Sequence, residues 1–420
     1  MLASSELDRN PGRVRELLDR HRPAPGEKDL RGWEWRYLWG AILPGSVDVL
    51  CRRDHSIFSL ALSADRRWVG IGEFNGGFSL WDLQTGKEVW SDPEPMIEGG
   101  RMDGTRVAFS SQTGQMAYSF RGLNEAHEVR VLDPGSQELV WHLLIGAPVR
   151  MLACTPDGGR WVVTTAGGSL QTWDAASGTL LHRWSITMNR EKIYNRGAPL
   201  AISPDGRLAA VDDMEGGVVV LDLETGTERH RLKTSQAQVC AMSFSPDGRR
   251  LAAGASYNEP VIRIWDLEQG RMEAELNGHY GWISGLTFLP DGRLLSASQD
   301  QSVRLWDVPS RSVRRVFRGH GKEVWSLALG SDSDLLLTGS KDGEVRRWSL
   351  KSAPTLGGAH RAQVGLRHWE THATPEGREL WSVNHKGLVC RLSGPGFRGF
   401  EERPEFGRAA ISLRVPPGGR

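Results

Sequence analysis

The chain has 420 residues, with 52 lysine and arginine residues against 51 aspartate and glutamate residues, so its net charge is close to zero. This balance excludes the strong positive field that draws nucleic acids or anionic membranes to a protein. Its 50 glycine and 17 tryptophan residues favour many short strands joined by tight turns.

No apolar run reaches the roughly 20 residues that a membrane-spanning helix needs. The first 20 residues carry charges in place of the apolar core of a secretory signal. We therefore expect no membrane segment and a cytoplasmic protein, with a membrane-anchored longer parent as the open alternative. The four cysteines show no C-x-x-C spacing, which predicts neither a zinc site nor a dithiol redox site.

Residues 1–42 differ in kind from the rest and predict a helical N-terminal extension or linker. Asn10 followed by Pro11 is typical of a helix start, and Asp29 opens a second helical segment. We expect the aromatic stripe of this second segment to pack on the domain that follows. The two stripes contain Val14, Leu17 and Leu18, and then Leu30, Trp33, Tyr37 and Leu38, widened by Trp35 and Trp39.

Beyond the extension, a turn of the form small-Pro-Asp-Gly-Arg recurs at a spacing of 41 to 48 residues. A second landmark, Trp-Asp or a variant of it, keeps the same period. Two landmarks in phase predict a repeat protein. The proline or its equivalent stands at 64, 112, 156, 204, 246, 290, 331, 375 and 416, and the Trp-Asp position at 81, 132, 173, 221, 265, 306, 348 and 391.

Apolar and polar residues alternate between these landmarks as they do in strands, which predicts four strands per unit. A single four-stranded sheet cannot bury both of its faces, so neighbouring units must stack face to face. Closing the stack into a ring removes its exposed ends. The repeat therefore predicts an all-β protein with the architecture of a β-propeller.

The repeats resemble the WD40 family, whose units carry Gly-His near the start and Trp-Asp near the end. Two Gly-His pairs, at 278–279 and 319–320, match the first element fully, and His55 and His360 match it in part. The resemblance covers about residues 45–420 and implies a WD40-type β-propeller over residues 45–395.

The number of blades depends on how the ring closes. Eight units are visible, and a strand at 47–50 could supply the outer strand of the last one, so we favour an eight-bladed ring. Seven blades with a displaced eighth unit stay open as the alternative. Residues 396–420 resemble the start of an incomplete further repeat, and we expect the chain to be a fragment of a longer protein.

The family resemblance also implies a hydrogen-bonded tetrad of histidine, hydroxyl, aspartate and tryptophan within a blade. All four members stand in the expected order in two units. Such a buried network is favourable only when every member is satisfied. The two tetrads are His279, Ser296, Asp300 and Trp306, and His320, Thr338, Asp342 and Trp348.

The sequence predicts no catalytic residue, no metal site, no cofactor and no enzymatic activity. The histidines of successive repeats fall on different blades, too far apart to share one metal ion. The aspartates that precede glycine in the recurring turn are expected to bind local backbone groups. No Gly-x-Ser-x-Gly elbow and no His-Arg-Asp or Asp-Phe-Gly kinase motif is present.

Four insertions mark a candidate binding surface, at 92–105, 122–127, 187–197 and 257–260. They fall in connections that emerge on the same face of a propeller, where loop variation commonly carries binding. The residue types are those that dominate protein interfaces. The candidates are Arg190, Lys192, Tyr194 and Arg196 within one insertion, and Trp282, Trp325 and Lys341 near the same rim.

These features favour a non-enzymatic scaffold or sensor that binds a protein or peptide, with an unknown oligomeric state. A second hypothesis is the detached sensor region of a bacterial serine/threonine protein kinase. It arises because residues 16–23 and 29–38 resemble the segment that precedes the WD40 repeats of large bacterial kinase-linked signalling proteins. A quinoprotein-like oxidoreductase propeller is a minor alternative, since no adjacent-cysteine pair supports it.

Overall fold

The computed structural model describes residues 18, 20, 47–92, 104–121, 127–186, 199–213, 217–234, 238–256 and 259–351, together with five later strands. The chain divides into two compact units, Met1–Leu350 and Lys351–Arg420. Each unit is described by itself. Of the predicted helical extension only Leu18 and Arg20 lie within the described residues, so the extension remains a prediction. Among the described residues, no helix has the length and apolar character needed to cross a membrane.

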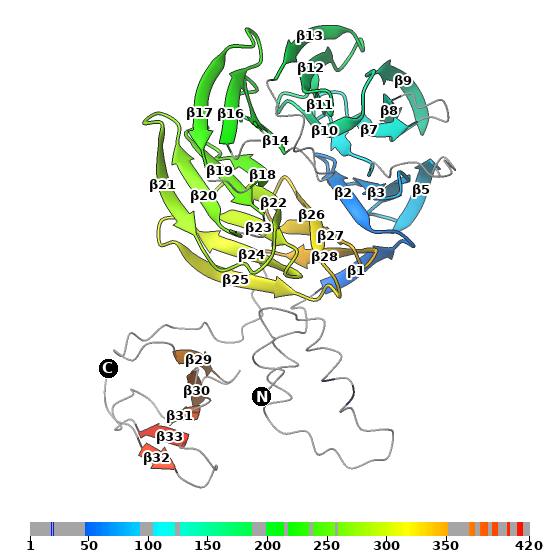
Figure 1. The fold of residues 1–420 in the computed structure, drawn as a ribbon. Helices are drawn as coiled ribbons and strands as arrows, with labels where there is room; N and C mark the ends of the chain where they lie inside the picture. Colours follow the sequence, from blue (N-terminus) through cyan, green and yellow to red (C-terminus); the bar gives the residue numbers. More distant parts are fainter. Residues whose placement is uncertain are drawn as a thin grey trace. The chain divides into compact units, whose positions relative to one another are not determined.

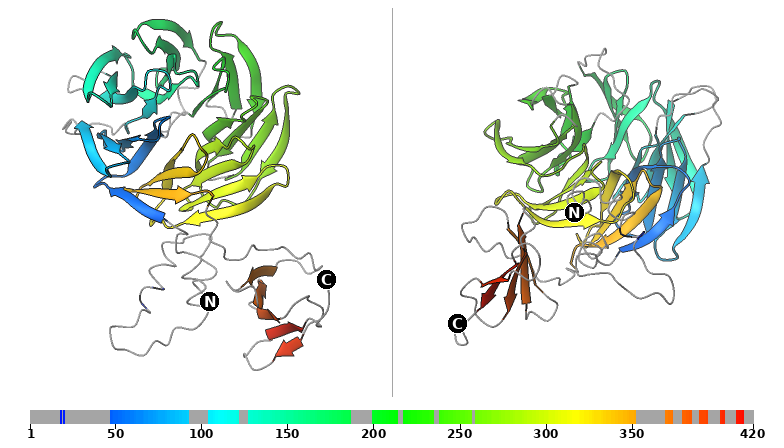
Figure 2. Two further views of the ribbon diagram at one scale, coloured as in Figure 1. Left: turned by 180° about the vertical axis from the view of Figure 1, so that it is seen from behind. Right: turned by 60° about the horizontal axis from the view of Figure 1, so that its bottom comes forward.

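The described part of the first unit contains 28 strands in seven four-stranded antiparallel sheets, arranged as blades around a ring (Figures 1 and 2). In chain order, the first blade contains β2 (Ile57–Leu62), β3 (Trp68–Glu73), β4 (Phe78–Asp82) and β5 (Lys87–Asp92), and the second contains β6 (Val107–Phe109), β7 (Met116–Arg121), β8 (His127–Asp133) and β9 (Glu138–Leu144). The third blade contains β10 (Val149–Cys154), β11 (Arg160–Thr165), β12 (Ser169–Asp174) and β13 (Leu180–Ser185). The fourth contains β14 (Leu200–Ile202), β15 (Leu208–Asp212), β16 (Gly217–Asp222) and β17 (Glu228–Lys233).

Blades five to seven complete the ring. The fifth blade contains β18 (Val239–Phe244), β19 (Arg250–Ala255), β20 (Ile262–Asp266) and β21 (Arg271–Leu276). The sixth contains β22 (Ile283–Phe288), β23 (Leu294–Ser298), β24 (Ser302–Asp307) and β25 (Ser312–Arg318). The seventh contains β26 (Val324–Leu329), β27 (Leu335–Ser340) and β28 (Glu344–Ser349), together with β1 (Val47–Arg52). In every blade the first strand in this order is the innermost.

The ring closes through β1, which pairs antiparallel with β28 from Val47↔Trp348 to Arg52↔Glu344 (Figure 1). The strand predicted at 47–50 is therefore an outer strand, but it completes the seventh blade. The favoured eight-bladed ring is wrong, because β1 occupies the outer edge of β28 and the first and seventh blades then pack directly on each other. The prediction of an all-β, WD40-type propeller is confirmed in its seven-bladed form.

The second unit contains the strands that the sequence assigned to an eighth repeat. β29 (Trp369–Ala373), β30 (Glu379–Asn384) and β31 (Val389–Ser393) pair antiparallel in order. The next partner of β31 is β33 (Ala410–Arg414), which runs parallel to it and also pairs with β32 (Glu401–Arg403). This sheet therefore departs from the four-stranded antiparallel order of the blades.

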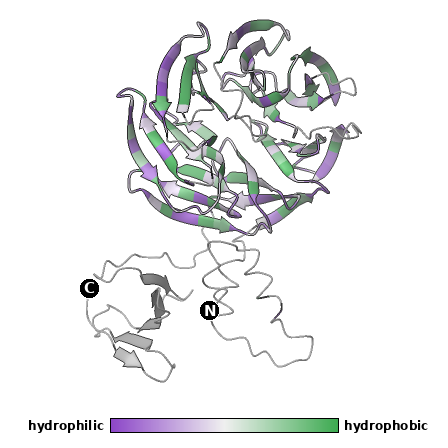
Figure 3. Cartoon of the chain, in the orientation of Figure 1, coloured by the Kyte–Doolittle hydropathy of each residue, from purple (hydrophilic) through white to green (hydrophobic). Residues whose placement is uncertain are grey.

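The core of the first unit lies between adjacent blades. Seven clusters of buried apolar side chains each combine residues of two neighbouring blades. The cluster between the seventh and first blades includes Ile57, Ile71 and Val345, all fully buried, together with Cys51 of β1. Polar residues concentrate on outer strands such as β17, β21 and β25 (Figure 3). Burial between blades thus supplies the packing that a single sheet lacks.

The recurring turn explains why so many aspartates follow a proline. In the fourth blade, Ser203 donates to the carboxylate of Asp205 at 2.6 Å, and that carboxylate accepts the backbone N–H of Arg207 at 3.0 Å. Gly206 adopts a positive φ of 70°, a conformation that costs glycine little. These aspartates are therefore occupied by local backbone and hydroxyl groups.

Candidate functional site

All four predicted insertions lie in connections whose described ends emerge at one end of the ring. Within an antiparallel blade, the connection from the second strand to the third emerges at the same end as the connection from the fourth strand to the next blade. The insertions lie between β5 and β6, β7 and β8, β13 and β14, and β19 and β20. We call this end of the ring the insertion face. Arg190, Lys192, Tyr194 and Arg196 lie outside the described residues.

Three aromatic rings from the first and seventh blades meet on the insertion face, and we call them the aromatic cluster. Phe58 lies on β2, Phe74 follows β3, and Trp325 lies on β26. The ring centroids are 5.7 Å apart for Phe58 and Phe74, 6.2 Å for Phe58 and Trp325, and 5.4 Å for Phe74 and Trp325, all with edge-on geometry. Each pair falls within the range of favourable aromatic contacts.

The cluster exists because the innermost strands are bulged. The register of β2 shifts between Ile57 and Ser59, and that of β26 shifts between Val324 and Ser326. The extra residue of a bulge is turned away from the regular ladder. Ile57 and Val324 are fully buried between blades, whereas Phe58 and Trp325 beside them stay partly exposed. Two large rings are thereby kept out of the core.

Arg106 covers the Phe58 ring, with its guanidinium carbon 3.9 Å from the ring centroid. The approach depends on Gly104, because a β-carbon at that position would collide with the Phe58 ring. Burial and the positive charge of Arg150 lower the pKa of Arg106 to about 9, which leaves it charged at neutral pH. The insertion face therefore presents a cation directly against aromatic surface.

The structure brings only part of the predicted surface into this cluster. Lys341 lies beside it, because its backbone carbonyl accepts a hydrogen bond from Ser56 at 3.3 Å, and its ammonium pairs with Glu323 at 2.9 Å. Trp282 occupies the repeat position of Glu323, two residues before the position of Trp325, and its carbonyl accepts the N–H of Gln299 at 2.9 Å.

Phe58, Phe74 and Arg106 were missed at the sequence level. The signal for Phe58 was present: it follows the first buried residue of its inner strand, as Trp325 follows Val324 in the last blade. Aligning the repeats on that position would have selected Phe58. No comparable signal marks Phe74 or Arg106, which reach the cluster through a turn and a long connection.

Two chains of buried hydrogen bonds cross the sixth and seventh blades. Trp306 Nε1 donates to Ser296 Oγ at 2.7 Å, and Ser296 Oγ lies 2.6 Å from Nε2 of His279, whose Nδ1 lies 2.7 Å from Asp300. Burial lowers the pKa of His279, so the neutral ring accepts from the serine and donates to the carboxylate. Every member of this chain has a partner.

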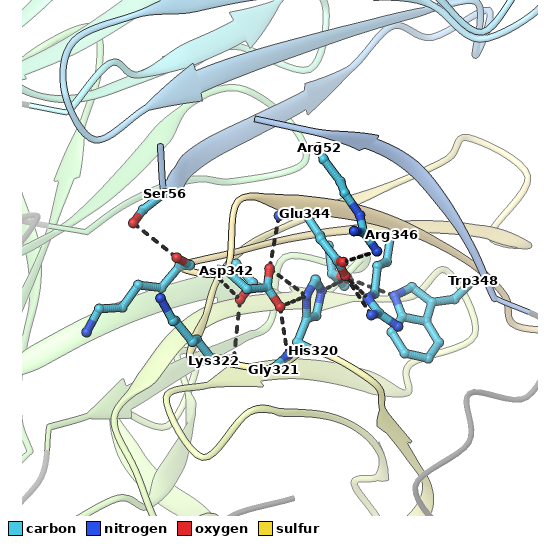
Figure 4. A network of polar contacts seen from close by, with 12 residues as sticks. Arg52, Ser56, His320, Gly321, Lys322, Asp342, Glu344, Arg346 and Trp348 are labelled. Carbon is cyan, nitrogen blue, oxygen red and sulfur yellow. Dashed lines mark hydrogen bonds and ion pairs between the residues drawn. The ribbon is translucent and has the colours of Figure 1, made fainter. Parts of the chain in front are cut away.

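The seventh blade repeats the arrangement with a threonine. Trp348 Nε1 donates to Thr338 Oγ1 at 2.8 Å, which lies 2.8 Å from Nε2 of His320. His320 Nδ1 is 3.1 Å from Asp342 (Figure 4). The network joins β27, β28, the turn between them and the connection before β26 within one blade, which is a structural role.

His320, Asp342 and Glu344 place three potential metal-ligating atoms within 4.8 Å of one another. Their existing contacts do not suit an ion. Both ring nitrogens of His320 are engaged within the tetrad. Glu344 pairs with Arg346 at 2.6 Å and with Arg52 at 2.9 Å (Figure 4). A divalent cation would have to displace two arginines from Glu344. Arg52 lies on β1 and Glu344 on β28, so their ion pair supports the closure of the ring and disfavours metal binding.

The tetrad aspartates predict how stability depends on pH. Burial alone would raise their pKa, but the adjacent histidine and further hydrogen bonds lower the pKa of Asp300 and of Asp342 to about 2. The pKa of an aspartate in the unfolded chain is about 3.9. The stability that Asp300 and Asp342 contribute is therefore complete above that pH and is lost as the pH falls towards 2. We expect the urea midpoint to drop over this interval and the drop to be smaller in Asp300→Asn. A profile unchanged by that substitution would contradict the assignment.

Three segments of the chain match the family described as WD domain, G-beta repeat: residues 226–266, 270–307 and 311–349. Each segment runs from the outer strand or outer turn of one blade through the three inner strands of the next. The matched segments include both complete tetrads.

The chain is also similar to several eukaryotic proteins. It is 22% identical over 365 residues to angio-associated migratory cell protein of Homo sapiens, covering 76% of this chain and 73% of that protein. It is 26% identical over 174 residues to autophagy-related protein 16 of Arabidopsis thaliana, covering 41% of this chain and 33% of that protein. Over 118 residues it is 26% identical to small ribosomal subunit protein RACK1y of Oryza sativa subsp. japonica, covering 26% of this chain and 34% of that protein. With the seven observed blades, these matches identify the chain as a seven-bladed β-propeller of the WD40 type.

Proposed function

We propose that the protein is a non-enzymatic binding platform and that a protein or peptide partner docks on its insertion face at the aromatic cluster. The observation that carries the proposal is that three large, partly exposed rings, Phe58, Phe74 and Trp325, contact one another on one face. Tryptophan, tyrosine and arginine anchors supply most of the binding energy in protein interfaces. A tryptophan held beside a cation-covered phenylalanine fits that role.

Further candidates extend this surface. Trp282 directly precedes β22 and Lys341 directly follows β27, both at the insertion face, and we place the basic and aromatic side chains of the 187–197 insertion there as part of the proposal: Arg190, Lys192, Tyr194 and Arg196. The rice relative supports a scaffold role, since its name assigns it to a ribosomal subunit, a large assembly. A cytoplasmic location is part of the same proposal.

The two alternative functions rest on different observations and predict different properties. A kinase-linked sensor rests on the resemblance at 16–38, which lies outside the described residues apart from Leu18 and Arg20, and the similar proteins reported above are eukaryotic. A quinoprotein-like enzyme would copurify with a coloured cofactor. An absorption spectrum of the purified protein separates that reading from a binding platform.

The test compares Trp325→Ala with Trp184→Ala. Both remove one partly exposed indole, but Trp184 lies on the outer strand β13, stacked on His182 with centroids 5.0 Å apart. Full-length proteins are immobilised at equal density, and proteins captured from a lysate of the source organism are quantified. We expect Trp325→Ala to lose its specific partners by about 30-fold in affinity, as for a hot-spot residue. Equal capture by the unsubstituted protein and by both variants would reject the proposed face.

A further inference from the structure

Arg106 carries a charge that no described residue of the protein neutralises. Its backbone N–H donates to Ser119 Oγ at 2.8 Å, and its guanidinium lies over Phe58. Within the described part of the chain, the guanidinium has no ion pair. Burial and then the like charge of Arg150 lower the pKa of Arg106.

Four other partly or fully buried arginines behave differently. Each has at least one carboxylate within ion-pair distance, as expected when a charge is removed from water. These pairs are Arg53 with Glu73 and Glu88, Arg130 with Asp92 and Glu128, Arg263 with Glu259 and Glu275, and Arg346 with Glu344. Arg106 differs from these four in having no such carboxylate among the described residues.

Arg150 occupies the position in its blade that Phe58 and Trp325 occupy in theirs. The register of β10 shifts between Val149 and Met151, so Arg150 is the extra residue of the bulge. It is therefore turned out of the regular ladder at the insertion face and is partly exposed. Two cations and three aromatic rings thus share one region of that face.

We propose that Arg106, supported by Arg150, binds an anionic group, a phosphate or a carboxylate, of a peptide whose apolar part contacts the aromatic cluster. A guanidinium offers a planar set of donors that matches either oxyanion in a two-point contact. Contact with the Phe58 ring restricts the motion of the Arg106 guanidinium before the ligand arrives. The inference rests on the proposed function and adds the chemistry of the partner.

The test uses three peptide libraries of random sequence with one fixed central residue: phosphoserine, glutamate or serine. The immobilised full-length protein is expected to retain phosphoserine or glutamate peptides roughly tenfold better than serine peptides, the effect of one charge-assisted contact. Preference for phosphoserine alone identifies phosphate as the anion, and equal preference for glutamate identifies a general acidic group. Equal retention of all three libraries overturns the proposal.

Substitutions assign the effect to the site. Arg106→Met is expected to lose the preference, whereas Arg314→Met, which removes an exposed charge paired with Asp307, is expected to keep it. Thermal unfolding of Arg106→Met should show no loss of stability, because an unneutralised buried charge is removed. If Arg106→Met keeps the preference while Trp325→Ala loses all peptides, the anion site is wrong and the proposed function stands. If Trp325→Ala retains peptides as well as the unsubstituted protein does, the proposed function itself fails.

Discussion

A protein that begins at Arg53 is expected to lose on the order of 5 kcal/mol of unfolding free energy, most of what a domain of ordinary stability has. Such a protein lacks β1, which provides the fourth strand of the seventh blade. Its loss exposes the edge of β28, removes buried Cys51 from the cluster between the seventh and first blades, and breaks the ion pairs of Arg52 with Glu344 and Asp48 with Arg347. Without β1, the junction between the seventh and first blades is held by contacts of the remaining inner strands alone.

The control for this truncation is a protein that begins at Ser46. It lacks the same preceding residues but retains the whole of β1. Urea unfolding followed by tryptophan fluorescence compares the two, and we expect a high midpoint with β1 and a low or broadened transition without it. Coincident transitions would show that β1 does not close the ring.

The second large effect is expected for Asp300→Ala, which should lower the unfolding free energy by up to about 3 kcal/mol, because it leaves buried hydrogen-bond donors unsatisfied. The carboxylate is buried and accepts from His279 and from Ser302 Oγ at 2.6 Å. Removing it leaves the N–H of His279 without an acceptor inside the blade. We expect the hydrogen bonds that join His279 to Ser296, and Ser296 to Trp306, to weaken as well.

Asp291→Ala is the matched control in the same blade. Asp291 is exposed, holds the recurring turn through the N–H of Arg293 at 3.1 Å, and pairs with the side chain of that arginine. We expect this substitution to cost about 1 kcal/mol or less. Equal losses for the two variants, measured by urea unfolding, would mean that the buried tetrad adds nothing beyond an ordinary turn contact.

The repeat made the propeller predictable, because both landmark turns and strand alternation are local features of the sequence. The number of blades was not predictable in the same way. β28 and β31 both offer an edge to an outer strand, and the sequence at Val47–Arg52 alternates in a manner that suits either. The partner of a strand is fixed by contacts between distant parts of the chain.

The candidate site was predictable only in part for a related reason. Trp325 was selected by residue type and by its place near the rim. Its contacts with Phe58 and Phe74 exist because the first and last blades of the ring are neighbours. With an eighth blade between them, those rings could not meet. The error in the number of blades therefore hid the contacts of Trp325 with the two phenylalanines. The contact of Arg106 with Phe58 joins the first and second blades and does not depend on that number.

Ring closure between the seventh and first blades is the basis of both the fold and the proposed site, and a cysteine cross-link tests it directly. Asp48 and Arg347 are exposed register partners on β1 and β28, and paired residues on antiparallel strands lie at a separation that a disulfide can bridge. In the double variant Asp48→Cys with Arg347→Cys, mild oxidation and peptide mapping should reveal one intramolecular disulfide between these positions in the monomer. The pair Asp48→Cys with Arg229→Cys, on the fourth blade, should give none. A chain in which positions 48 and 347 fail to cross-link would contradict the seven-bladed ring and, with it, the aromatic cluster on its insertion face.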